Sequence, residues 1–156
     1  MDIKQLLEFF TINPFWGIDS IKECNPNSYQ VFTTIYHLPN DYIQLLTITD
    51  GFVLFHSGDF IIYDIAQVLK YNTDPLYSNN FKDSILHIGF FLERNIVIDQ
   101  RKADTDYYLF AGDCCSTDEF VCLGTITDFL NGLARTLGKI PFWDEGGPYW
   151  DFGVNA

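Results

Sequence analysis

The sequence contains few basic residues, and it lacks both a secretory signal and a long apolar run. Lys plus Arg number 9 against 21 for Asp plus Glu, which gives a net charge of −12 at pH 7. A chain with this charge is repelled by phosphate, so neither nucleic acid nor an anionic membrane is an expected partner. No apolar run approaches the length that spans a bilayer, and no N-terminal stretch combines basic residues, an apolar run and a cleavage site. A cytoplasmic protein is therefore expected.

Cysteine is also scarce for a chain of this length. The four cysteines are Cys24, Cys114, Cys115 and Cys122. Two of them are adjacent, which is a strained spacing for an intramolecular disulfide, so reduced structural thiols are the simplest interpretation. A zinc site would need a Cys-x-x-Cys pair or histidines interleaved with the cysteines. All three histidines precede the last three cysteines in the sequence. We expect no metal site.

Motifs of catalysis and of cofactor binding are missing as well. The sequence has no Gly-x-Ser-x-Gly, no phosphate-binding Gly-rich loop, no dinucleotide fingerprint and no His-Glu-x-x-His. The nearest candidate is residues 56–59 (HSGD), where His56, Ser57 and Asp59 share one predicted hairpin tip. Neighbours in a tight loop rarely point at each other as a catalytic triad does, so a small hydrolase stays a minor alternative. We expect no enzyme activity and no cofactor.

Apolar residues are plentiful and dominate the patterns that remain. They make up 47% of the 156 residues and aromatics 17%, enough for a single domain over 1–156 with a core of its own. The helical spacing of Ile3, Leu6, Leu7 and Phe10 predicts a first helix over 2–10 with Asp2 at its N-terminus. Turn residues then predict irregular structure with a turn of helix at 20–24, and the intervening Phe15 and Trp16 are expected to fold back as apolar lids.

Residues 31–52 contain the clearest local signals. Residues 31–38 (VFTTIYHL) are rich in β-branched and aromatic residues, which by itself predicts a strand, although Pro39 follows directly. Pro39 suits a first helical position and Gly51 a helix end, so a helix is expected between them. Its apolar face would be formed by Tyr42, Leu45, Leu46 and Thr49.

The remaining patterns predict one antiparallel sheet and two more helices. Residues 52–55 and 60–64 form a hairpin pattern around a polar loop, and 64–72 then has helical spacing with Ile65, Val68 and Leu69 on one face. Four strands are expected over 85–90, 95–100, 107–112 and 120–124, and a last helix from Thr125 or Thr127 to Gly138. The apolar stripe of this last helix would be formed by Phe129, Leu130, Leu133 and Leu137. The expected fold class is α+β, a single mainly antiparallel β-sheet covered by helices.

Residues 38–52 (LPNDYIQLLTITDGF) also resemble the LP-x-D/E-Y…N/D-G signature of the SUKH superfamily. That superfamily contains bacterial toxin-immunity proteins and fungal regulators of cell-wall synthesis. Similar segments follow in the same order, at residues 60–72 (FIIYDIAQVLKYN), 85–90 (ILHIGF), 95–113 and 126–137, so that the resemblance covers about 36–137. One departure is that residues 27–37 (NSYQVFTTIYH) contain no acid, whereas the family usually carries a helix with an acidic residue there. The matching motif residues are Leu38, Pro39, Tyr42, Gly51, Gly89 and Asp99.

The resemblance implies a SUKH-like fold and the role of an immunity protein, an antitoxin that binds a cognate polymorphic toxin and blocks it by occlusion. The net charge independently favours a basic toxin, such as a nuclease, because opposite charge speeds encounter. A regulatory or scaffold protein-interaction module without a toxin partner is the alternative. We expect the chain itself to be a monomer or a weak homodimer.

The expected contacts with the toxin are acidic and aromatic. Five acids lie between the predicted strands but lack the spacing of a calcium loop, which favours a solvated acidic rim. Residues 139–156 form an aromatic C-terminal tail that could pack onto the sheet, the preferred interpretation, or present interface anchors. The candidate toxin-binding residues are Asp59, Asp104, Asp106, Asp113, Asp118, Glu119, Trp143, Tyr149 and Trp150.

Overall fold

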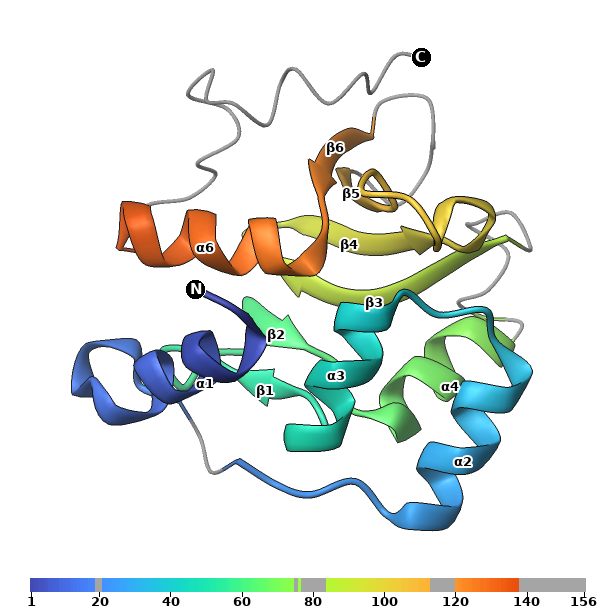
Figure 1. The fold of residues 1–156 in the computed structure, drawn as a ribbon, viewed down its shortest axis with the longest axis horizontal. Helices are drawn as coiled ribbons and strands as arrows, with labels where there is room; N and C mark the ends of the chain where they lie inside the picture. Colours follow the sequence, from blue (N-terminus) through green and yellow to red (C-terminus); the bar gives the residue numbers. More distant parts are fainter. Residues whose placement is uncertain (19–20, 75, 77–83, 113–119, 138–156) are drawn as a thin grey trace.

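A computed structural model describes residues 1–18, 21–74, 76, 84–112 and 120–137. In these ranges the chain forms a single six-stranded antiparallel sheet with the order β1-β2-β3-β4-β5-β6, accompanied by helices, so the predicted α+β class is confirmed (Figure 1). The helices are α1 (Ile3–Ile12), α2 (Pro26–Ile35), α3 (Asn40–Ile48), α4 (Ile65–Thr73) and α6 (Ile126–Thr136), with short 3₁₀ helices η1 (Pro14–Trp16) and η2 (Gln100–Lys102). The strands are β1 (Phe52–Val53), β2 (Phe60–Ile62), β3 (Ile85–Phe91), β4 (Arg94–Asp99), β5 (Leu109–Gly112) and β6 (Val121–Gly124).

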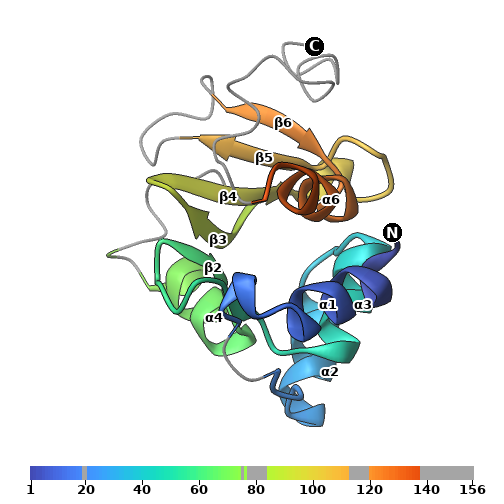
Figure 2. The ribbon, with the colours of Figure 1, turned by 90° about the vertical axis from the view of Figure 1, so that its left-hand side faces the viewer.

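Every strand of the described sheet pairs with its neighbour in sequence, so the sheet is a simple meander. Helices α1, α3 and α6 lie together beside it, and α4 packs against β3 (Figure 2). One continuous apolar core joins the helices to the alternate strand residues Leu86, Ile88, Ile96 and Ile98. A smaller cluster, which includes Val97, Phe110 and Cys122, lies apart from this core.

The first helix begins where the sequence predicts it. The Asp2 side chain accepts a hydrogen bond from the Gln5 amide at 2.8 Å, and the Gln5 side chain accepts one from the Asp2 amide at 3.0 Å. This reciprocal cap satisfies two amides that a helix start leaves without partners. The four predicted apolar residues are all buried, as is Trp16, whereas Phe15 is 51% exposed and packs edge-on against Trp16, with ring centroids 5.1 Å apart.

The prediction of a strand over 31–38 is wrong, because residues 26–35 form helix α2. The Asn25 side chain accepts hydrogen bonds from the amides of Asn27 and Ser28, and Pro26 occupies the first helical turn, where its missing amide costs nothing. Helical spacing then buries Phe32 alone and leaves the β-branched residues outside. Residues 21–24, where a turn of helix was predicted, form no helix.

Helix α3 lies close to its predicted position but differs at both ends. Pro39 precedes the helix as its N-cap, and the helix ends at Ile48, so that buried Thr49 is already extended. Gly51 has a φ of 69°, three residues beyond the helix end, and serves the turn into β1. Tyr42, Leu45 and Leu46 are buried as predicted.

The hairpin, the four later strands and the last two helices are confirmed. Leu69 on α4 is only partly buried, whereas Ile65 and Val68 are fully inside. In α6, Thr125 rather than Thr127 caps the N-terminus. Leu137 does not continue the apolar stripe, because it adopts a left-handed cap conformation and is 53% exposed. The predicted end at Gly138 lies outside the described residues.

Candidate functional site

The structure places the predicted acids that it describes at opposite ends of the sheet. Asp59 is exposed in the β1–β2 loop, where its carbonyl accepts a hydrogen bond from the amide of Leu92 in the β3–β4 turn at 2.9 Å. The exposed Glu93 belongs to that same turn, so it joins Asp59 at this end. Glu93 was not among the predicted residues, although its place between two predicted strands could have indicated it.

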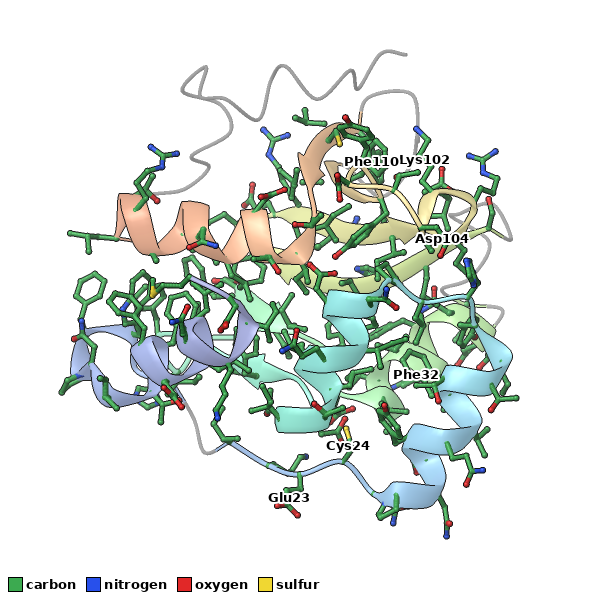
Figure 3. All side chains as sticks on the ribbon, in the orientation of Figure 1. Glu23, Cys24, Phe32, Lys102, Asp104 and Phe110 are labelled. Atoms are coloured by element: carbon green, nitrogen blue, oxygen red, sulfur yellow. The ribbon has the colours of Figure 1, made fainter. Side chains whose placement is uncertain are left out.

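Asp104 and Asp106 are exposed at the other end, between η2 and β5. The six residues of β4 separate this end from the hairpin turn, a distance of roughly 17 Å. The Asp104 carboxylate lies 3.0 Å from His37 Nε2, which fixes it beside the segment between α2 and α3. A basic residue lies at this end too. The ammonium group of Lys102 lies 5.1 Å from the centre of the Phe110 ring (Figure 3). This end is therefore mixed in charge, and so is the hairpin end, where Arg94 at the start of β4 directly follows Glu93.

The remaining predicted contact residues cannot be placed. They are Asp113, Asp118, Glu119, Trp143, Tyr149 and Trp150, all of which lie outside the described residues.

The motif residues lie in the interior, as scaffold. Leu38, Pro39 and Tyr42 are buried, and the Tyr42 hydroxyl has no hydrogen-bond partner among the described residues. Gly51 and Gly89 both lie very close to the backbone of β2. A Cβ atom on Gly51 would lie 2.5 Å from the Ile62 oxygen, and one on Gly89 would lie 2.6 Å from the Ile61 oxygen. Only glycine fits such a contact without a backbone shift.

Asp99 is the one buried acid of the motif set, with 3% exposure. Its two oxygens accept hydrogen bonds from Arg101 Nε at 3.0 Å and Nη2 at 2.8 Å. Burial alone would raise the pKa of this carboxyl, but the Arg101 hydrogen bonds and charge outweigh burial and lower it. Asp99 is therefore a charged structural anchor at the end of β4.

Asp41 has a structural role that sequence reasoning missed. Its Oδ2 atom accepts hydrogen bonds from the Thr127 amide at 3.1 Å and the Thr127 hydroxyl at 2.8 Å, while Oδ1 accepts one from the Tyr108 hydroxyl. The acid in the family-like motif thus binds the N-terminus of α6, 86 residues away, where the helix dipole favours negative charge.

Two surface hollows flank residues 22–24. The first, of about 260 Å³, lies at β1 and the start of α4 and is lined by Lys22, Asp50, Asp64 and Gln67 among others. Both aspartates use one oxygen to accept amides of the first turn of α4, at 2.8 and 2.7 Å. Lys22 Nζ lies 3.7 Å from the second oxygen of Asp64, and its side chain is 64% exposed, so this ion pair is weak.

The second hollow, of about 240 Å³, lies between α2 and α3 and is lined by Glu23, Cys24 and Tyr29. Figure 3 shows Glu23 directed away from the fold and Cys24 directed toward it. The Cys24 thiol donates to the Leu46 carbonyl at 3.2 Å, and burial together with the nearby Asp50 raises its pKa to about 12. A thiol with that pKa stays protonated at neutral pH and is a poor nucleophile or metal ligand.

The hairpin tip that carries the hydrolase alternative has the bonding of a tight turn. Ser57 Oγ accepts a hydrogen bond from the Asp59 amide at 3.2 Å, and the Ser57 carbonyl accepts one from the Phe60 amide at 3.1 Å. His56 has a φ of 52°, in the left-handed region, which the turn requires. These bonds use the Ser57 oxygens to fix the backbone of the loop.

His87 is the most strongly perturbed histidine. It is 8% exposed, Nε2 lies 2.8 Å from the Gly89 carbonyl, and its ring packs against Tyr63 and Tyr71. Burial lowers its pKa to about 4, because the hydrogen bond with the Gly89 carbonyl raises the pKa by less than burial lowers it. His87 is therefore a neutral core residue, whereas His37 is exposed and paired with Asp104.

No set of three or more His, Cys, Asp or Glu side chains in the described ranges could hold a metal ion. Within the same ranges, no helix has the length and apolar character needed to cross a membrane. A comparison with models of known protein families gives no match, and a comparison with curated proteins finds no significant similarity.

Proposed function

We propose that this protein is a cytoplasmic immunity protein of the SUKH type, which binds a cognate toxin with a basic surface and neutralises it. The observation that carries the proposal is the net charge of −12 on a folded domain whose motif residues are buried. With those residues inside, the exposed acids form the part of the chain that a partner would meet.

The fold supports the proposal through the order of its elements. The helix of the LP-x-D/E-Y-like motif, the hairpin, α4, the paired strands and α6 follow one another as the resemblance implies. The motif glycines also have a structural reason, since both pack against the backbone of β2. The sequence signature is therefore compatible with a scaffold that presents other residues to a partner.

Electrostatics indicates how the partner would be captured. Opposite charges accelerate encounter by factors of roughly 10 to 1000 at low salt, and salt removes most of that gain. A nuclease toxin needs a basic surface to hold phosphate groups, so an acidic protein seated on that surface would exclude the substrate. Occlusion of this kind requires no catalytic residue on the immunity protein.

The test is binding to the product of an adjacent toxin gene. The two proteins should co-purify, co-expression should rescue growth, and the association rate constant should fall steeply between 50 and 500 mM NaCl. If a basic toxin and the purified chain do not bind at low salt, the proposal is wrong, and the regulatory scaffold alternative gains support.

Charge reversal at each end of the sheet would locate the contact. Asp59→Lys and Asp104→Lys each change the net charge by +2, and Glu8→Lys on α1 makes the same change elsewhere on the exposed surface. We expect Asp59→Lys to lower the association rate constant roughly 3- to 10-fold and to raise the dissociation rate constant. Glu8→Lys should produce only the smaller, long-range decrease in association rate. If all three substitutions changed the rate constants equally, the hairpin end would be excluded as the contact with the toxin.

A further inference from the structure

Helix α2 carries an exposed surface without charged residues on this acidic molecule. Residues 25–37 contain no Asp, Glu, Lys or Arg, in a chain whose net charge is −12. Six residues on the outer side of α2 are exposed, and we call them the α2 face: Asn27, Ser28, Gln30, Val31, Thr34 and Ile35.

The α2 face presents apolar groups to solvent. Val31 is 53% exposed and Ile35 61%, and the two lie one helical turn apart on the same side. The Thr34 hydroxyl donates to the Gln30 carbonyl at 2.7 Å, so its polar atom is already bonded within the helix. Covering the part of this face formed by Val31, Thr34 and Ile35 with another apolar surface would therefore cost little in lost hydrogen bonds to water.

The helix itself is firmly attached to the fold. Phe32 is fully buried and packs against Tyr36 and Tyr42, with ring centroids 5.3 and 6.4 Å apart. Figure 1 shows α2 at the periphery of the molecule, and Figure 3 shows Phe32 directed inward from it. The α2 face is thus a preformed surface, which avoids the entropy cost of ordering a segment on binding.

We propose that the α2 face binds the α2 face of a second copy of this chain, in a weak symmetric dimer. Two copies that each carry −12 repel one another wherever charged faces meet, and interface centres are depleted in charged residues. Among the described α-helices, α2 alone has no charged residue, so contact there brings no like charges face to face. A two-fold axis that sets the helices antiparallel would also align their dipoles favourably.

The size of the face sets the strength of the dimer. A helix of 10 residues is about 15 Å long, and a contact of that length buries less than the ~800 Å² per partner of a standard stable interface. The dissociation constant should therefore lie between roughly 10 µM and 1 mM. This inference is independent of the proposed toxin partner.

Salt dependence distinguishes this contact from a toxin contact. Added salt screens the repulsion between the two acidic copies, so the dimer should strengthen while binding to a basic partner weakens. We expect sedimentation equilibrium between 10 µM and 1 mM to show an association constant about 3- to 10-fold higher at 500 mM than at 50 mM NaCl.

Substitutions test the location. The double variant Val31→Glu/Ile35→Glu should be monomeric throughout this range. The matched control, Ile12→Glu/Leu137→Glu, adds the same charge at two other exposed apolar residues, 79% and 53% exposed, and should still dimerise. NMR of the unmodified chain provides a second measurement that does not depend on a variant. The chemical shifts of the backbone amides on α2 are expected to change with protein concentration.

Three results would overturn the proposal: a monomer at 1 mM at both salt concentrations, an association that weakens with salt, or a dimer that persists in the Val31→Glu/Ile35→Glu variant. If the chain is monomeric and this variant instead loses binding to a toxin, the α2 face belongs to that partner and not to a second copy.

Discussion

Tyr108 donates its hydroxyl hydrogen to Asp41, and its oxygen accepts the Ile126 amide at 2.7 Å. One phenol directly before β5 thus joins the first turn of α3 to the first turn of α6. Burial and the Asp41 charge raise the pKa of Tyr108 far above its usual range, so the hydroxyl remains a donor at every accessible pH. Three elements that are distant in sequence therefore share one buried polar contact.

Replacing Tyr108 with Phe should destabilise the fold. The substitution removes one oxygen and takes from the Asp41 Oδ1 atom and the Ile126 amide the hydroxyl that both bond, which typically costs about 1–3 kcal/mol in the free energy of unfolding. Chemical denaturation measures the loss. Tyr29→Phe removes the same atom from a partly buried tyrosine on α2 and should change the free energy by less than about 0.5 kcal/mol. Equal effects would contradict the role of Tyr108.

Gly89→Ala should be strongly destabilising, although the backbone of Gly89 does not have a positive φ. The added Cβ would lie 2.6 Å from the Ile61 carbonyl oxygen, so β2 and β3 would have to move apart. We expect a loss of about 2 kcal/mol or more in the free energy of unfolding. Gly58→Ala is the control, because nothing lies within 4 Å of its Cβ position. A Gly89→Ala protein as stable as Gly58→Ala would show that the strands are not tightly paired there.

His87 should make the fold sensitive to mild acid. Its pKa is about 4 in the folded protein against 6.5 in the unfolded chain, so protonation favours unfolding. The stability contributed by neutral His87 is complete above about pH 6.5 and decreases as the pH falls toward 4, by about 1–3 kcal/mol in all. Urea denaturation at pH 7 and pH 5 would detect this slope. His87→Gln keeps a donor for the Gly89 carbonyl and should remove the slope, and a variant that retained it would assign the slope to other groups.

Arg101→Gln should destabilise the protein by about 1–3 kcal/mol at pH 7, because it leaves the buried Asp99 carboxylate without its cation. The lower part of that range is expected, since the Arg101 side chain is 65% exposed. The pKa of Asp99 is lowered in the folded state, so the stability it contributes is present above about pH 3.8 and lost below it. The difference between variant and original protein should therefore shrink in strong acid. Arg135→Gln, at an exposed position on α6, should show neither effect.

Local sequence patterns predicted most of the elements because most of their boundaries depend on neighbouring residues. Asp2 and Thr125 cap their helices through contacts within three residues, and short loops close the β1–β2 and β3–β4 hairpins. Residues 31–38 were mistaken for a strand because Val31, Thr34 and Ile35 have high strand propensity. Their side chains point outward from a helix fixed by the Asn25 cap and by buried Phe32, and tertiary packing outweighed that propensity.

The candidate site was harder to predict, because it depends on contacts between distant residues. The sequence indicated that Asp59 and Asp104 would be exposed, but only the strand register places them at opposite ends of β4. The contact from Asp41 to Thr127 spans 86 residues, and no local pattern encodes it. The Asp-x-x-Gln cap at residues 64–67 was a usable local signal for the acidic hollow at α4.

The packing of α1 against α6 also affects how the chain can fold during synthesis. Helix α1 is made first among the described elements, yet the apolar residues of α6 that help to cover it are made last. A nascent chain that has reached only β5 can pair its strands with their sequence neighbours, but α1 still lacks α6 as a packing partner. The ribosome must therefore release residues up to about 136 before the core closes, and until then the part of α1 that packs against α6 stays exposed to chaperones.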